Sequence, residues 1–172
     1  MTVLLRRTEK LAGALPLSES VPDSSDTALG DWYVNRLVVD RQPLLLLVSA
    51  VTLLPLVVPA RDVRGLPNCL ATLIRRRLQR FRLPPACVDA EIAAMSRVCV
   101  AKTASRSVLG VMNDFAQGVP FHLPIGGWDE TSLPFLEDRL AQTPIFASRP
   151  VSEVVFPERA TPERLLAKWA AG

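Results

Sequence analysis

A stretch without any charged side chain, Pro43–Ala60, most strongly limits the folds open to this chain. Its 18 residues lie between two arginines and are just long enough for a membrane-spanning helix. However, Pro55 and Pro59 interrupt it, and its many Val and Leu residues are typical of buried strands. The stretch therefore predicts two buried strands, at 43–49 and 51–58, and no membrane helix.

Further strands follow from composition and alternation. The segments 2–7 and 97–102 each hold a short apolar run and few turn residues, and 31–40 alternates imperfectly between apolar and polar side chains. An Asp-Arg-Gln-Pro turn follows 31–40, so an antiparallel meander with the next two strands is the simplest assembly. Pro55 lacks a donor for the sheet, which places its strand at an edge or a bulge.

Helices are predicted where apolar residues recur three and four positions apart. One such stripe runs through 66–82, with most arginines of that segment pointing away from it. Arg77 falls within the stripe, so we expect it to snorkel or to pair with a carboxylate. Further helices are expected from Pro85, from an N-cap at Ser105 to Gly118, over 133–140, and from an N-cap at Thr161.

The length of 172 residues corresponds to about one domain. We therefore predict a single α+β domain over residues 1–172, with a mainly antiparallel sheet and helices packed on one face. The segment 16–28 is rich in Ser, Asp and Pro and is expected to be a surface loop. The segment 120–160 is expected to be largely irregular.

Positive charge is concentrated in one part of the chain. Residues 61–82 hold seven Arg and one Asp, a local charge of +6, whereas the whole chain carries +3. A basic helix face of this kind is a candidate surface for a nucleic acid or an acidic protein. The competing interpretation is an ordinary solvated helix face. The candidate nucleic-acid surface consists of Arg75, Arg76, Arg80 and Arg82.

Cysteine and histidine are too few and too scattered for a zinc site. Cys69, Cys87 and Cys99 lie far apart in apolar surroundings, and His122 is the only histidine. We expect buried, reduced thiols, no metal and no cofactor. The first residues show no signal-peptide pattern, so we expect a cytoplasmic protein.

The turn at 102–107, Lys-Thr-Ala-Ser-Arg-Ser, gathers hydroxyls and two cations where a helix is expected to begin. A helix N-terminus offers unpaired N–H groups and a partial positive charge, which favour a phosphate or a carboxylate. Alternatively, the turn is only a helix cap with an internal ion pair, for example between Arg106 or Lys102 and Asp31 or Asp40.

A second polar group of residues surrounds Trp32, Tyr33 and Asn35. Aromatic rings beside an amide can stack on and recognise a nucleobase. The simpler interpretation is that Trp32 belongs to the core. Catalysis would require carboxylates such as Asp31 and Asp114 to converge, and their spacing does not force this. The chain has no GxGxxG, P-loop, HExxH or GxSxG motif, so the sequence leaves enzymatic activity open and favours its absence.

Three motifs together suggest a family. They are Leu-Gly-x-Trp-Tyr-x-Asn-x-Leu from Leu29, the Asp-Arg pair at Asp40, and Lys-Thr-x-Ser-Arg-Ser-Val-Leu-Gly-x-Met-Asn-Asp from Lys102. In this combination the chain resembles the bacterial domain-of-unknown-function family DUF6933, over roughly residues 2–169. The resemblance implies an intracellular bacterial domain and assigns no reaction to it. The candidate ligand-binding residues are Trp32, Asn35, Asp40, Arg41, Lys102, Thr103, Ser105, Arg106, Ser107, Asn113 and Asp114.

Three hypotheses of function follow. The first is a non-enzymatic binding module whose anion-binding surface takes a nucleic acid or an acidic partner. The second is a hydrolase or transferase acting on a phosphorylated substrate at the 102–107 turn. The third is a homodimer that buries its apolar 44–58 region between two copies.

Overall fold

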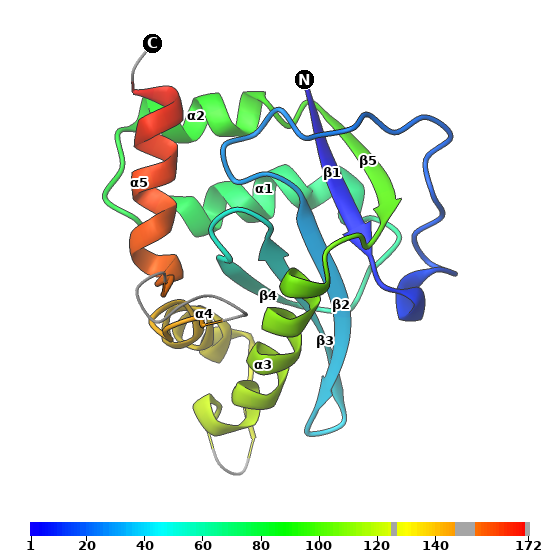
Figure 1. The fold of residues 1–172 in the computed structure, drawn as a ribbon. Helices are drawn as coiled ribbons and strands as arrows, with labels where there is room; N and C mark the ends of the chain where they lie inside the picture. Colours follow the sequence, from blue (N-terminus) through cyan, green and yellow to red (C-terminus); the bar gives the residue numbers. More distant parts are fainter. Residues whose placement is uncertain (125–126, 147–153, 171–172) are drawn as a thin grey trace.

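The computed structural model describes residues 1–124, 127–146 and 154–170 (Figure 1). They form one sheet with helices around it. The elements in chain order are β1 (Thr2–Arg7), the 3-10 turn η1 (Glu9–Leu11), β2 (Trp32–Val39), β3 (Gln42–Ser49), β4 (Pro55–Pro59), α1 (Leu66–Leu78), α2 (Pro85–Ala93), β5 (Arg97–Lys102), α3 (Arg106–His122), the 3-10 turn η2 (Glu130–Ser132), α4 (Leu133–Ala141) and α5 (Pro157–Trp169).

The sheet has the strand order β4-β3-β2-β1-β5 and is mixed. The predicted meander is present, because β2, β3 and β4 pair antiparallel, and the strand that contains Pro55 lies at an edge. The prediction of a mainly antiparallel sheet was wrong, since β1 pairs parallel with both β2 and β5. Parallel neighbours require long connections, and residues 8–31 and the α1–α2 segment provide them.

Helices cover both faces of the sheet rather than mainly one. Leu45 and Leu47 of β3 pack in one apolar cluster with residues of α1, α2 and α5. Leu44 and Leu46 point the other way and pack in a second cluster with residues of α3 and α4. In the view of Figure 1, α3 lies in front of the sheet and α1 behind it. A continuous apolar strand such as β3 is thus buried on both sides.

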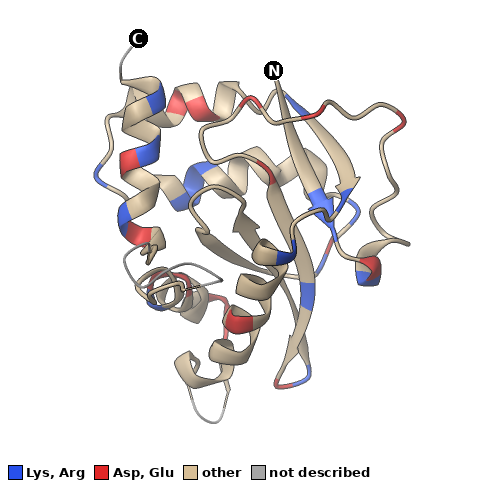
Figure 2. Cartoon of the chain, viewed as in Figure 1, with Lys and Arg blue, Asp and Glu red and all other residues tan. Residues whose placement is uncertain are grey.

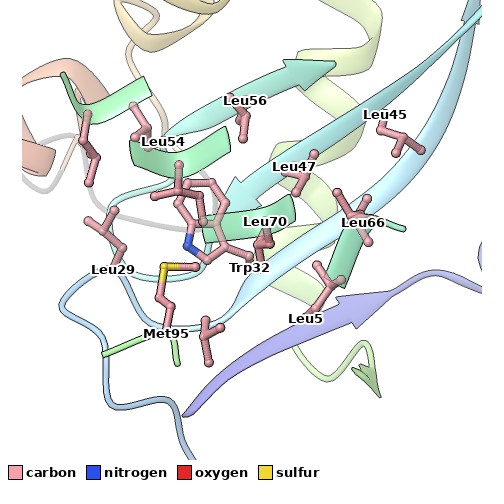
Figure 3. Packing of buried hydrophobic residues seen from close by; sticks show 14 of the residues in the cluster. Leu5, Leu29, Trp32, Leu45, Leu47, Leu54, Leu56, Leu66, Leu70 and Met95 are labelled. Carbon is pink, nitrogen blue, oxygen red and sulfur yellow. The ribbon is translucent and has the colours of Figure 1, made fainter. Parts of the chain in front are cut away.

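The first cluster is built around Trp32, which has no exposed surface. Figure 3 shows its indole among Leu29, Leu70 and Met95, which come from three separate segments of the chain. Trp32 was a candidate ligand-binding residue, and the structure places its ring within the core. The simpler interpretation of Trp32 is confirmed.

Much of the apolar 44–58 region is buried inside the single chain. Leu44–Val48 are between 0% and 2% exposed, because helices cover the sheet on both faces. Within 44–58 the exposed large apolar side chain is Val51 (41%), so the region offers little apolar surface to the homodimer that the sequence suggested. Within the described residues, no helix combines the length and apolar character needed to cross a bilayer.

The segment 16–28 contains no helix or strand and is tied to the sheet and to a buried carboxylate. The backbone N–H of Ser18 donates to the Val100 carbonyl (3.0 Å). Glu91 of α2 is fully buried and accepts the N–H groups of Ala28 (2.7 Å) and Leu29 (3.0 Å). It also accepts the indole N–H of Trp169 (2.7 Å), so one carboxylate joins α2, this segment and α5.

The chain after α3 is more helical than predicted. α3 continues past Gly118 to His122 with Pro120 inside it, and the predicted 133–140 helix is present as α4. α5 starts at Pro157, so Thr161 does not cap it. Thr161 is instead buried, and its hydroxyl bonds to that of Thr52 (3.0 Å). The remainder of 120–160 includes residues 125–126 and 147–153, which lie outside the described residues.

Candidate functional site

The turn at 102–107 and the start of β2 lie side by side in the folded chain. Arg6 of β1 is aligned with Tyr33 of β2 on one side and with Ala101 of β5 on the other. The parallel pairing brings the carboxyl ends of β1 and β5 to the same edge, where α3 begins. The backbone N–H of Ser105 then donates to the hydroxyl of Tyr33 (3.1 Å), which fixes the turn against β2.

An ion pair between Arg6 and Asp31 holds the backbone of this turn in place. The Nε of Arg6 donates to Asp31 (2.5 Å), and its second guanidinium nitrogen donates to the carbonyl of Lys102 (2.8 Å). Asp31 also accepts from the hydroxyl of Ser25 (2.6 Å), which in turn accepts the N–H of Leu4 (2.9 Å). The internal ion pair predicted for Asp31 exists, but its partner is Arg6 and not Lys102 or Arg106.

The first turn of α3 keeps several donors free. The Oγ of Ser105 accepts the N–H of Val108 (3.2 Å), which confirms Ser105 as the N-cap. The N–H groups of Arg106 and Ser107 have no partner among the described residues. Lys102 and Arg106 are exposed, and neither forms an ion pair among the described residues. Figure 2 shows basic positions at the end of β5 and at the start of α3. The turn can therefore present cations and amide donors to a ligand.

Four other candidate residues lie away from this turn. Asp40 and Arg41 form the tip of the β2–β3 hairpin, with positive φ angles of 51° and 65°. Asp40 is seven positions after Tyr33, which corresponds to a distance of roughly 23 Å along the strand. Asn113 and Asp114 are exposed on α3, about 12 Å along the helix axis from its N-cap. Asp31, Asp40 and Asp114 therefore lie apart, and the convergence of carboxylates that catalysis would require is not found among them.

Asn35 and Thr103 lie closer to the site but have limited roles in it. The amide oxygen of Asn35 accepts the hydroxyl of Thr8 (2.7 Å) and the N–H of Arg36 (2.8 Å). This carbonyl stabilises the end of β1 rather than facing α3. Thr103 is half-buried within the turn, and Ser107 is exposed on the first turn of α3.

The candidate nucleic-acid surface on α1 is largely neutralised by carboxylates. Arg75 bonds to Asp89 of α2 (2.6 Å). Arg80 bonds to Glu137 (2.7 Å) and to Asp138 (2.6 Å), both on α4. Of the four predicted arginines, only Arg76 and Arg82 are exposed without an ion pair among the described residues. The α1 face is thus a weaker polyanion surface than its sequence indicates.

Arg77 joins the same group of charges from inside the core. It is 2% exposed, lies 3.5 Å from Asp138, and its Nε donates to the carbonyl of Pro55 (3.4 Å). This confirms the prediction that Arg77 pairs with a carboxylate. We call Arg77, Arg80, Glu137 and Asp138 the α1–α4 ion-pair cluster. The carboxylate of Glu137 also accepts the N–H of Val57 on the edge strand β4 (2.7 Å).

Burial and pairing shift the pKa values within the α1–α4 ion-pair cluster. Burial lowers the pKa of Arg77, and the nearby charge of Arg80 lowers it further. Burial alone would also lower the pKa of Arg80, but its hydrogen bonds to Glu137 and Asp138 outweigh this and raise it. Burial raises the pKa of Glu137, although the bonds from Arg80 and Val57 oppose that change. These charges are thus paired with one another, and Arg77, Arg80 and Glu137 also line a pocket between β4, α1 and α4.

Sequence reasoning missed Arg6, Ser25 and the structural role of Tyr33. Tyr33 is 3% exposed, so its hydroxyl positions Ser105 and its ring does not stack on a base. The one available signal for Arg6 was a charged residue inside an otherwise apolar strand. Cys87 and Cys99 are buried as predicted, whereas Cys69 is exposed. Among the described residues, no group of His, Cys, Asp or Glu is arranged to hold a metal ion.

Residues 4–160 match the family described as "Domain of unknown function (DUF6933)". The chain belongs to this family. The match confirms the resemblance predicted from the motifs at Leu29, Asp40 and Lys102, all of which lie within the matched residues. A search of curated proteins and a search of solved structures found no match to the chain. For this DUF6933 domain, the geometry of the site is therefore the evidence that bears on function.

Proposed function

We propose that the protein is a non-enzymatic binding module whose anion-binding surface is the first turn of α3. One observation carries the proposal: Lys102 and Arg106 remain exposed and unpaired among the described residues, beside the free amides of Arg106 and Ser107. A 17-residue helix adds the partial positive charge of its N-terminus to these donors. Together they suit one carboxylate or phosphate group.

An acidic protein partner fits this surface better than a long nucleic acid. A polynucleotide is held by many phosphate contacts spread over a basic face. Two of the four arginines that would extend such a face, Arg75 and Arg80, are paired with carboxylates of α2 and α4. The two cations and two backbone amides at the start of α3 form a small site. One or two acidic side chains of a partner protein match the size of this site.

The enzymatic alternative has less support. A hydrolase or transferase at this turn needs an acid or a base in contact with the ligand. Asp31 is held by Arg6 and Ser25, and Asp114 lies further along α3. Neither carboxylate is free and close to Ser107. We therefore propose binding and not turnover.

Binding of two labelled probes at low and physiological salt tests the proposal. The probes are a capped hexaglutamate peptide and a short single-stranded oligonucleotide. Lys102→Ser with Arg106→Ser should weaken peptide binding about tenfold, because two charge-assisted contacts are lost. The matched control is Arg76→Ser with Arg82→Ser, which removes the same charge from α1 and the segment that follows it.

The control separates a defined site from general attraction between charges. Equal losses in the two double variants would show that only net charge matters, and would overturn the proposal. Tighter binding of the oligonucleotide that depends on Arg76 and Arg82 would instead favour the α1 face and a nucleic acid.

A further inference from the structure

The strand β2 has a free edge over its second half. β1 pairs with β2 only at Trp32–Val34, whereas β3 pairs with β2 along its whole length. Figure 1 shows the β2–β3 hairpin continuing beyond the end of β1. The last bond on the β1 side runs from the N–H of Thr8 to the carbonyl of Val34 (3.2 Å). Beyond that bond, the edge has no neighbouring strand among the described residues.

The backbone groups on this edge point outward in a regular order. Because the Val34 carbonyl faces β1, the N–H and C=O groups of Arg36 and Val38 face the same side. The amide oxygen of Asn35 occupies the N–H of Arg36 (2.8 Å). The carbonyl of Arg36 and both backbone groups of Val38 have no partner in the described chain. The side chain of Val38, on this edge, is 64% exposed.

A groove of about 510 Å³ runs along the same edge. One wall comes from α3, with Ala116 and Pro120, and the other comes from Lys10 of η1. Its volume lies within the range of sites that hold a ligand. The floor of the groove is the second half of β2, formed by Arg36, Leu37, Val38 and Val39.

The two sides of the groove differ in chemistry. Side chains alternate along β2, so Leu37 faces α3 while Arg36 faces the opposite side, near Lys10. The α3 side, with Leu37 and Ala116, is apolar. The other side carries two cations, and neither Lys10 nor Arg36 forms an ion pair among the described residues. The nearest acidic residue in sequence, Glu9, pairs with Arg7 (3.4 Å).

We propose that this edge binds an extended segment of a partner protein, which adds a strand to β2. Backbone bonds to Arg36 and Val38 would hold the segment, as in other cases of strand addition. Because side chains alternate, apolar residues of the segment face α3 and acidic residues face Lys10 and Arg36. A second copy of this chain is a poorer occupant, since pairing the two edges brings four cations together. This surface is separate from the α3 N-terminal turn.

A capped peptide of alternating Glu and Val residues is the probe, and its binding is followed by fluorescence anisotropy. Two altered peptides serve as controls. In one, alternate backbone nitrogens are methylated, which removes strand hydrogen bonds and keeps the charge. In the other, Lys replaces Glu. We expect both changes to weaken binding about tenfold or more, since each removes several contacts.

Variants of the protein locate the site on β2. Val38→Pro removes one outward N–H at an edge position that tolerates proline, and Val38→Thr keeps that N–H as the matched control. Arg36→Glu should favour the Lys-Val peptide over the Glu-Val peptide. Lys102→Ser with Arg106→Ser should leave this binding unchanged, which separates the edge from the α3 turn.

Each outcome decides the proposal. Loss of binding in Val38→Pro and in the methylated peptide, but not in Val38→Thr, supports strand addition. Equal binding of the methylated and unmethylated peptides overturns it, as does the absence of binding by the Glu-Val peptide. A dimer of the free protein, abolished by Val38→Pro in sedimentation measurements, would overturn it in favour of a second copy.

Discussion

The α1–α4 ion-pair cluster and the α3 N-terminal turn contain the same kinds of basic side chain in opposite situations. In the cluster, Arg77 is 2% exposed, and Arg80 bonds to carboxylates that lie more than fifty residues away in sequence. At the turn, Lys102 and Arg106 are exposed and lack such partners among the described residues. Whether a basic residue is free to bind a ligand therefore depends on whether the fold places a carboxylate from a distant part of the sequence beside it. The number of basic residues nearby in the sequence does not predict this.

Glu137→Ala should have the largest effect on stability. The substitution removes the buried carboxylate that pairs with Arg80 (2.7 Å), and it also leaves the N–H of Val57 on the edge strand without its acceptor. Removing one partner of a buried ion pair costs about 3–5 kcal/mol. Urea unfolding measures the loss. The control is Glu130→Ala, which removes an exposed pair with Arg61 and should change stability by less than about 1 kcal/mol.

If Glu137→Ala lowers the free energy of unfolding by less than about 1 kcal/mol, the contrast between the α1–α4 ion-pair cluster and the α3 N-terminal turn is wrong. It would mean that the α1 arginines do not depend on α4, and that they are as available to a ligand as Lys102 and Arg106. The α1 face would then return as a candidate nucleic-acid surface.

Arg80→Ala should have the second largest effect, about 2 kcal/mol, because hydrogen bonds to charged groups are lost at a partly exposed position. Its control, Arg76→Ala, removes an arginine of α1 that forms no ion pair in the described chain, and should change stability by less than about 0.5 kcal/mol. Thermal unfolding of both variants measures the difference. Equal shifts would show that pairing with α4 does not explain the loss in Arg80→Ala.

Local features of the fold could be predicted from the sequence. The charge-free stretch gave two strands, Pro55 marked an edge strand, and Ser105 before an apolar stripe marked an N-cap. Each of these depends on a physical rule that acts over a few residues. Arg77 was also predictable, since a cation within an apolar stripe needs a carboxylate or a route to water.

Long-range features could not be predicted in the same way. β1 pairs parallel with β2 because residues 8–31 lead the chain back to the start of the sheet before β2 begins. No local sequence pattern predicts the path of that segment, or that β5 pairs with β1 on its other side. The pairing of Asp31 with Arg6 follows from that register, so the sequence suggested nearer cations instead. The carboxylates of α4 neutralise α1 for the same reason.

Lys102→Ser with Arg106→Ser should barely change stability, by less than about 0.5 kcal/mol, because both side chains are exposed. The same double variant is expected to lose hexaglutamate binding. A loss of function without a loss of stability is what separates a ligand surface from a structural cluster. Urea unfolding beside the binding assay gives both values. A stability loss near that of Arg80→Ala would place these cations in a structural role.

The pH dependence of stability should give the smallest effect, and only in the buried cluster. Burial raises the pKa of Glu137 above its ordinary value of 4.5, so the folded protein holds this proton more tightly than the unfolded chain does. The contribution of this group to stability is therefore fully present below the unfolded value and is lost as pH rises through the folded value. Between neutral pH and about pH 5, the wild type should gain stability relative to Glu137→Gln as the pH falls. Urea unfolding of both proteins at several pH values measures this difference. A difference that shrinks on acidification would show that Arg80 and Arg77 outweigh burial and keep the carboxylate ionised, which would make the contrast with the exposed turn at α3 sharper still.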